Sequence, residues 1–294
     1  MQSPNESTDR LAFLTSPNTS LVAAPRKHDS SLRLQPRDVE LLRLLLNHFG
    51  LLTRRHICEL FPGRGIRRTN RRLHKLIAAR FISKRLPTTY LMQEIPLYYL
   101  GPRAFEALDL DPHDPLLIAK RKQAAHLRER ALPHFMLTNA VHIKFLTAEI
   151  AYPDYKLLSW VPSDDAIWTM LNDLGFPLRP DAYIEFQKDA ISHCVFLELD
   201  RSTERAPRLQ DRLAAYNDYA LSGSFRDHFA AERFRVAFIP PSSRRRDHLL
   251  RAMNSYPAGL FFSTSFEEFF SRSLFEEQWK SNATEGLLSL DTPA

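Results

Sequence analysis

Hydrophobic and polar positions follow a helical pattern from Gln35 onward. The segment PRDVELLRLLLNHFG has a proline in its first turn, apolar residues at helical spacing from Val39 to Phe49, and a closing Gly50. TRRHICELF predicts a short second helix, and IRRTNRRLHKLIAARF predicts a third with one apolar stripe. FISKRL and IPLYYL then predict the two strands of a hairpin. Three helices followed by a hairpin is the order of a winged helix-turn-helix domain, which we expect over residues 33–110.

The pattern becomes mixed after a charged helical run that predicts a linker helix over residues 111–132. The next segments predict the order α-β-β-β-α-β-α-β, in which the apolar strand HCVFLELD is central. This order predicts a three-layer α/β domain around a mixed sheet over residues 133–280, so the chain as a whole is of the α+β class. Residues 1–32 and 281–294 lack a sustained period and are predicted to be disordered tails.

Composition places the chain among globular proteins without a membrane span. Its 294 residues are 44% hydrophobic, which is enough for a large core and allows two domains. We find no apolar run of about 18 residues and no signal-peptide pattern, so we expect no membrane association. The two cysteines, Cys58 and Cys194, exclude a disulfide scaffold and fit a reducing cytosol, so a cytoplasmic location is expected.

The positive charge is concentrated in one window. The net charge of the chain is +6, but no acidic residue occurs between Glu59 and Glu94, where nine basic residues lie. That window therefore carries +9 and the rest of the chain −3. A local basic patch of this kind is typical of a protein that binds a polyanion.

The third predicted helix lies inside this window, where a winged helix-turn-helix domain would place it in the major groove. Its arginine and lysine side chains would pair with phosphates, and Asn70 and arginines could contact base edges. We expect double-stranded DNA as the partner, contacted by Arg64, Arg67, Arg68, Asn70, Arg71, Arg72, Lys75, Lys84 and Arg85. The alternative is a solvated basic helix in a winged helix that binds proteins.

Three carboxylates form the second candidate site. The strand period of two puts Glu198 and Asp200 on one face of the central strand, and Asp181 begins the preceding strand. If the two strands pair, the three side chains converge at one sheet edge and offer oxygen ligands to Mg²⁺ or Mn²⁺. The alternative is a set of acids neutralised by nearby arginines such as Arg201.

These residues carry a resemblance to a known family. The Pro-Asp pair at 180–181 and FLELDRSTE at 196–204, after a winged helix, resemble the replication-relaxation family of plasmids and mobile elements. The carboxylate pattern on the order α-β-β-β-α-β resembles the restriction-endonuclease-like, or PD-(D/E)XK, superfamily, and the replication-relaxation family is similar to conjugative relaxases of the MobC type. The resemblance spans about residues 35–279 and implies other mobilisation or replication proteins as partners.

One departure from the superfamily pattern bears on activity. The superfamily lysine would stand at the position of Asp200, and the following helix offers Arg212, which holds its proton too firmly for acid-base work. Two hypotheses follow. The first is metal-dependent DNA nicking, with Asp181, Glu198 and Asp200 holding the metal and Arg201 or Arg212 supplying a cation beside the phosphate. The second is a non-catalytic DNA-binding regulator with a degenerate nuclease fold. The sequence leaves the oligomeric state open.

Overall fold

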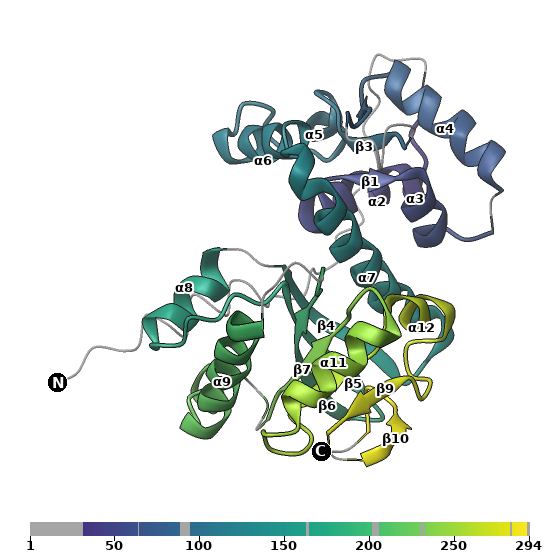
Figure 1. The fold of residues 1–294 in the computed structure, drawn as a ribbon. Coiled ribbons are helices and arrows are strands. Elements are labelled where there is room, and N and C mark those ends of the chain that lie inside the picture. Colours follow the sequence, from purple (N-terminus) through teal and green to yellow (C-terminus); the bar gives the residue numbers. More distant parts are fainter. Residues whose placement is uncertain are drawn as a thin grey trace. The chain divides into compact units, whose positions relative to one another are not determined.

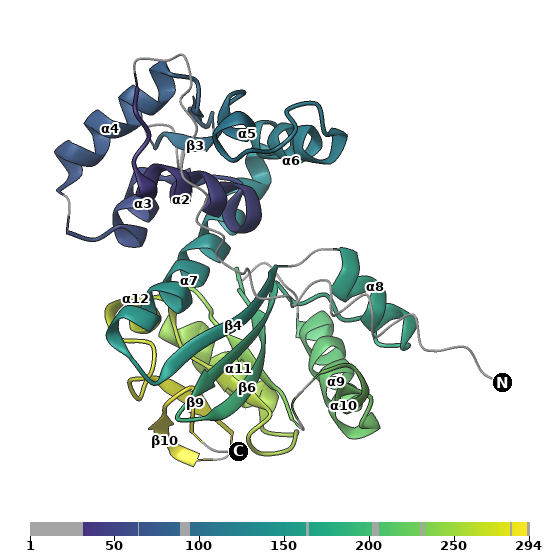
Figure 2. The ribbon, with the colours of Figure 1, turned by 180° about the vertical axis from the view of Figure 1, so that it is seen from behind.

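The computed structural model describes residues 32–63, 65–88, 95–162, 165–201, 206–229, 231, 233–282 and 284–292. The chain is of the α/β class and forms two compact units that divide between Ile143 and Lys144 (Figures 1 and 2). We call the described residues up to Ile143 the N-terminal unit and those from Lys144 the C-terminal unit. The predicted tail over residues 1–32 lies outside the described residues except for Leu32. None of the helices in the described ranges has the length and apolar character needed to cross a bilayer.

The N-terminal unit combines helices with a small antiparallel sheet. Its elements are α2 (Pro36–Leu44), the π-helical turn η1 (Leu45–Phe49), β1 (Leu52–Thr53), α3 (Arg54–Leu60), α4 (Ile66–Ala78), β2 (Ile82–Arg85), β3 (Leu97–Leu100), α5 (Ala104–Ala107), α6 (Pro115–Ala125), η3 (Glu129–Ala131) and the first part of α7 (Leu132–Ala151). The sheet order is β1-β3-β2, and Ser83 of β2 pairs with Tyr99 of β3. The three helices and the hairpin match the sequence prediction, whereas the two-residue strand β1 was not predicted.

Local sequence explains where these helices begin. Asp38 closes a capping box at the start of α2 by accepting a hydrogen bond from the Gln35 amide at 2.6 Å. The Thr53 hydroxyl accepts from the His56 amide at 3.1 Å and caps α3 as expected of a threonine N-cap. Leu73 and Leu76 of α4 are buried, so the apolar stripe of this helix faces the core of the unit.

A glycine sets the distance between the end of α4 and β3. A Cβ atom at Gly101 would lie 2.3 Å from the carbonyl oxygen of Arg80, which is closer than any side chain permits. The Gly101 amide donates to the Phe81 carbonyl at 2.9 Å in this close approach. The glycine therefore allows the hairpin to pack directly against the segment that follows α4.

The C-terminal unit is built on one mixed sheet. Its elements after α7 are β4 (Tyr155–Pro162), α8 (Asp165–Asp173), β5 (Ala182–Lys188), β6 (Ile191–Glu198), α9 (Ala206–Ser222), α10 (Phe225–His228), β7 (Arg235–Phe238), α11 (Ser243–Met253), β8 (Phe261–Ser263), α12 (Phe266–Ser271), β9 (Trp279–Ser281) and β10 (Thr284–Leu288). The sheet order is β10-β9-β8-β7-β6-β5-β4. Strands β6, β7 and β8 are parallel, while β4-β5-β6 pair antiparallel.

Helices pack on both faces of this sheet. On one face, Phe196 of β6 belongs to a core that includes Leu213 of α9, Leu249 of α11 and Leu171 of α8. On the other face, Phe145 of α7 contacts Phe186 of β5 with ring centroids 6.1 Å apart. Because side chains alternate along β6, Glu198 lies on the same face as Phe196 and points toward α9.

The C-terminal unit contains helices α10 and α12 and strand β9, which were not predicted, and it differs from the sequence prediction in three further places. Helix α8 is inserted between β4 and β5, where no helix was expected. Strand β6 ends at Glu198, so Asp200 lies two residues beyond the strand. The predicted tail from residue 281 contains β10, which pairs with β9 and extends the sheet. Its sequence gives a weak signal because a short edge strand needs little apolar periodicity once a neighbouring strand supplies hydrogen bonds.

Candidate functional site

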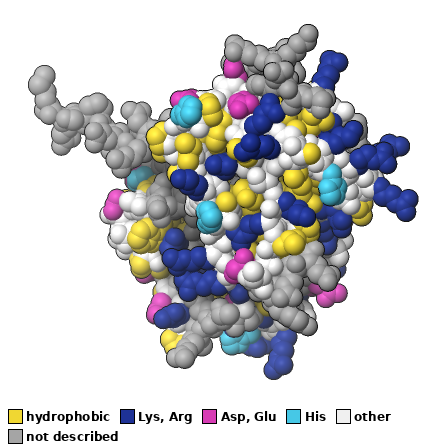
Figure 3. All heavy atoms as spheres, turned by 90° about the horizontal axis from the view of Figure 1, so that it is seen from above, with side chains coloured by type: hydrophobic (Ala, Val, Ile, Leu, Met, Phe, Trp, Pro, Cys, Tyr) yellow, Lys and Arg dark blue, Asp and Glu magenta, His cyan; other side chains and the backbone are white. Residues whose placement is uncertain are grey.

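Helix α4 displays four of the predicted basic residues to solvent. Arg67, Arg68, Arg71 and Lys75 are exposed, and Asn70 is half-buried. Within the described part of the chain, no acidic side chain forms an ion pair with these four cations. Lys and Arg side chains project on the right of Figure 3, the side on which α4 lies in Figure 1. This face can therefore hold several phosphate groups without first breaking internal ion pairs.

The positive charge extends through the whole N-terminal half. Residues 20–143 contain 22 Lys and Arg and 10 Asp and Glu, so their net charge is +12. Because the chain totals +6, the remaining residues carry −6. The two parts of the molecule therefore differ in sign, which the overall net charge conceals.

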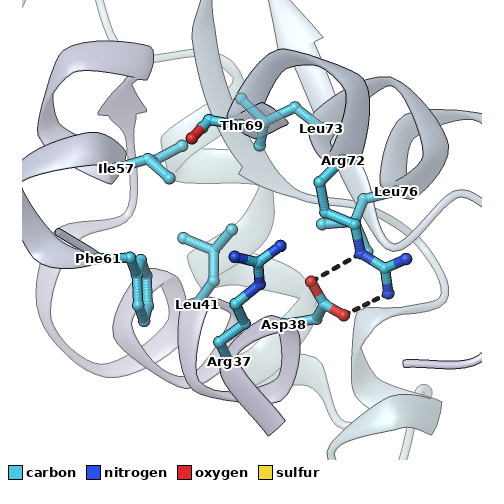
Figure 4. Close-up of a pocket in the computed structure, with 9 residues that line it drawn as sticks. All are labelled: Arg37, Asp38, Leu41, Ile57, Phe61, Thr69, Arg72, Leu73 and Leu76. Carbon is cyan, nitrogen blue, oxygen red and sulfur yellow. Dashed lines mark hydrogen bonds and ion pairs between the residues drawn. The ribbon is translucent and has the colours of Figure 1, made fainter. Parts of the chain in front are cut away.

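Arg72 is the exception on α4, because its side chain turns toward α2. Its Nε donates to Asp38 Oδ1 at 3.0 Å, a second nitrogen binds the other Asp38 oxygen, and that nitrogen also donates to the Arg33 carbonyl at 2.9 Å (Figure 4). Asp38 is only 2% exposed. This bidentate pair fixes α4 on α2 and gives Arg72 a structural task that the sequence did not reveal.

A small hollow lies next to this ion pair (Figure 4). It is lined by side chains of α2, α4 and the α3 region, among them Leu41, Ile57 and Leu73, and its volume is about 30 Å³. That volume holds no more than about one water molecule. The hollow is a packing gap between helices, far smaller than a site for a nucleotide or another small ligand.

The two predicted wing residues differ from each other. Lys84 is exposed, whereas the side chain of Arg85 is 15% exposed and bonds within the unit. Arg85 donates to the carbonyls of Ala125 and Leu127 at 2.8 and 3.0 Å and to Glu129 at 2.9 Å. Arg64, the remaining predicted contact, lies outside the described residues.

Glu198 lies buried at the end of β6 and is held by two residues of α9. Its Oε2 accepts from Arg212 Nη1 at 2.6 Å, and its Oε1 accepts from the Tyr216 hydroxyl at 2.6 Å. Burial, followed by the adjacent Glu198 carboxylate, raises the pKa of Tyr216 well above its ordinary value. The tyrosine therefore stays protonated and serves as a permanent hydrogen-bond donor to Glu198.

The other predicted acids lie at the same edge of the sheet but have partners of their own. Asp181 Oδ2 accepts from the Leu199 amide at 2.7 Å. Asp200 is 8% exposed, and its Oδ2 accepts from Arg245 Nε of α11 at 2.5 Å. Arg201 is exposed. The structure thus brings Asp181, Glu198 and Asp200 to one edge and places arginine beside two of them.

This arrangement does not fit a bound Mg²⁺ or Mn²⁺ as it stands. Among the described residues, no three His, Cys, Asp or Glu side chains form a group that could hold a metal ion. A metal bound by Glu198 and Asp200 would have to displace Arg212, Tyr216 and Arg245 from the carboxylate oxygens. An arginine in contact with a carboxylate already neutralises the charge that would attract the cation.

Sequence reasoning missed three residues that organise these sites, namely Tyr216, Arg245 and Asp38. Tyr216 is four residues after the predicted site residue Arg212 on α9, so the two share a face, but only the packing shows that this face meets Glu198. Arg245 was visible only as part of an arginine run at the start of α11. Asp38 lies in the first turn of α2, and its bond to Arg72 depends on a tertiary contact that the sequence pattern does not show.

Comparison with known proteins gives one match. The family model described as replication-relaxation matches residues 42–231, which is well over half of the chain and extends from α2 beyond α10. Neither a curated protein nor a solved structure matches the chain significantly. The family match indicates a role in the replication or mobilisation of plasmids or other mobile elements. The chain belongs to the replication-relaxation family.

Proposed function

We propose that the protein binds double-stranded DNA through its N-terminal unit, with α4 in the major groove. The observation that carries the proposal is the set of exposed basic residues on α4, namely Arg67, Arg68, Arg71 and Lys75, with no acidic partner in the described ranges. Each such side chain that meets a phosphate releases condensed counterions, and this release favours binding.

The order of elements supports this assignment. Helix α2, strand β1, helices α3 and α4, and the β2–β3 hairpin follow the order of a winged helix-turn-helix domain. In such domains the third helix enters the major groove and the hairpin contacts the adjacent backbone. Asn70 lies on α4 between arginines, where an amide can bond an adenine edge.

The rigid attachment of α4 also supports the proposal. The buried Asp38–Arg72 pair joins α4 to α2 through two hydrogen bonds. A helix held in this way loses little conformational freedom when it binds, which favours affinity. Arg72 acts as a positioning residue, and Arg71 beside it is exposed and available to the DNA.

We infer that the C-terminal unit contributes no strand cleavage. The order α7-β4-β5-β6-α9-β7 resembles a restriction-endonuclease-like core, and Asp181, Glu198 and Asp200 lie at its expected edge. However, Glu198 and Asp200 are bonded to arginines, the lysine position holds Asp200 instead, and Arg212 on the following helix keeps its proton too firmly to act as a base. A degenerate nuclease fold that supports a DNA-binding regulator fits these contacts best.

The affinity for a duplex of about 25 base pairs tests the DNA-binding proposal. At about 0.1 M salt each lost phosphate contact removes about one factor of ten, so Arg67/Arg71/Lys75→Ala should bind at least about 100-fold more weakly. The matched control Lys156/Arg208/Arg251→Ala removes three exposed charges from the C-terminal unit and should bind like wild type. Wild-type affinity in the α4 variant would contradict the proposal.

A nicking assay on supercoiled DNA tests the absence of cleavage. We expect no nicked product with Mg²⁺ or Mn²⁺ under conditions in which the protein is bound. Metal-dependent nicking by wild type that Glu198→Ala abolishes, while the variant still binds DNA, would instead support the metal-dependent alternative.

A further inference from the structure

A second basic stretch follows the hairpin of the N-terminal unit. Between Asp114 and Glu129 the chain has no acidic residue, and it contains Lys120, Arg121, Lys122 and Arg128. Most of this stretch is α6, whose N-terminus is capped by Asp114. An acid-free basic helix in a unit of net charge +12 is a candidate contact for a polyanion.

Helix α6 exposes its basic side chains rather than using them in the core. None of its residues is fully buried, and Lys120 and Lys122 are exposed, as is Arg128 just beyond the helix. At 100° per residue, the two lysines flank the exposed face whose centre lies near Gln123. A helix with one lysine on each flank of an exposed face can reach two neighbouring phosphates.

The β2–β3 hairpin fixes α6 in place. Arg85 of β2 donates to the carbonyl of Ala125, the last residue of the helix, to the carbonyl of Leu127 just beyond it, and to Glu129. Leu127 and Ala124 also pack in a cluster with Leu97 of β3. The segment is therefore a rigid neighbour of the hairpin, and a guanidinium is favourable at the negative end of the helix dipole.

The arrangement of the unit relates α6 to α4. In both ribbon views α4 and α6 lie on opposite sides of β3 (Figures 1 and 2). Lys and Arg side chains are spread over the face seen from above in Figure 3. A duplex that receives α4 in its major groove and meets the hairpin alongside would continue toward α6.

We propose that α6 is a second DNA contact, in which Lys120, Lys122 and Arg128 bind backbone phosphates on the hairpin side of the α4 site. This inference rests on the proposed DNA binding by α4 and adds a flanking site to it. Because phosphates carry no sequence information, α6 adds affinity and lengthens the footprint without changing base preference. Arg85 is then the positioning residue that holds α6 against the hairpin.

The test compares the wild type, Lys120/Lys122/Arg128→Ala and Lys156/Arg208/Arg251→Ala on one duplex of about 30 base pairs. Alanine favours helix, so α6 should remain folded, and circular dichroism checks this. We expect the α6 variant to bind at least about 100-fold more weakly at about 0.1 M salt, with a slope of log K against log salt smaller by about 2 to 3. Its hydroxyl-radical footprint should lose protection at one flank, and its relative affinity for two unrelated duplexes should not change.

The outcomes separate this inference from the proposed function. If the wild type binds the duplex and the α6 variant keeps both the wild-type slope and the full footprint, the second contact does not exist, while binding by α4 stands. If the wild type does not bind duplex DNA, the proposed function itself is wrong. An equal loss in the variant of the C-terminal unit would also overturn the inference, because it would show a nonspecific charge effect.

Discussion

Arginine has different tasks in the two units of this protein. On α4, Arg67, Arg68 and Arg71 face solvent with no acidic partner among the described residues. In the C-terminal unit, Arg212 and Arg245 each bond a buried carboxylate. Residues 20–143 carry a net charge of +12 and the rest of the chain carries −6. Arginine side chains are therefore surrounded by excess positive charge in the first part and by excess negative charge in the second.

The comparison shows that the number of arginines says little about DNA binding. What matters is whether an acid of the same chain already occupies the guanidinium. Even α4 contains both cases, since Arg71 is exposed while Arg72 is bonded to Asp38. Removal of single partners, acidification and added metal each test this contrast.

Removal of Asp38 should have the largest effect on stability. Asp38→Ala leaves Arg72 without its carboxylate and breaks the capping box of α2, so we expect unfolding to become easier by about 4 kcal/mol. Arg71→Ala, the matched change at the exposed neighbour, should alter stability by less than about 0.5 kcal/mol. Urea denaturation measures the free energy of unfolding of both variants. Equal small effects would contradict the structural role that we assign to Arg72.

Acidification should destabilise the N-terminal unit through His56. Burial lowers the pKa of His56 to about 4. Between about pH 6.5 and pH 4 the imidazole is therefore protonated in the unfolded chain and neutral in the folded chain. The stability that neutral His56 contributes is fully present above about pH 6.5 and is lost as the pH falls. Near pH 4 the free energy of unfolding should be lower by about 3 kcal/mol. His56→Gln should therefore lose less stability than the wild type between pH 7 and pH 4. Equal losses in the two proteins would show that protonation of His56 is not the cause.

Two tyrosines of α9 should respond differently to loss of the hydroxyl group. Tyr216→Phe removes a donor from buried Glu198 and should cost about 1–2 kcal/mol. Tyr219 is equally buried, but its hydroxyl has no hydrogen-bond partner among the described residues, so Tyr219→Phe should be neutral or stabilising. Thermal melts of the two variants give the comparison, and equal costs would show that the Glu198 contact contributes nothing.

Divalent metal should have the smallest effect. Because arginines already neutralise Glu198 and Asp200, we expect millimolar Mn²⁺ to leave the melting temperature of the wild type unchanged. A rise in the melting temperature of several degrees that Asp181→Ala abolishes would show that the carboxylates bind a metal ion. That result would contradict the view that arginines already occupy these carboxylates.

The sequence predicted the elements better than the partners of the side chains. The periodicity of α4 and the apolar run of β6 identified both elements, since local pattern determines which face is buried. The same pattern could not show that Arg72 turns toward Asp38, 34 residues away, or that Arg85 holds Leu127. Such contacts depend on tertiary packing, which periodicity does not encode.

The carboxylate edge illustrates the same limit. Sequence spacing correctly brought Asp181, Glu198 and Asp200 to one edge of the sheet, because β5 and β6 pair as the pattern implied. It did not show that α9 and α11 bring Arg212 and Arg245 to these acids. The possible metal ligands and their neutralisation by nearby arginines were therefore visible in the sequence as alternatives, while the bonds from Arg212 to Glu198 and from Arg245 to Asp200 were not.

The salt dependence of DNA affinity tests the contrast between the two units most directly. We expect the slope of log K against log salt to fall by about 2 to 3 in Arg67/Arg71/Lys75→Ala and to stay at the wild-type value in Lys156/Arg208/Arg251→Ala. Both variants lose three exposed positive charges, so only the location of the charges differs. A wild-type slope in the α4 variant, or an equal fall in both, would contradict DNA binding by the exposed arginines of α4.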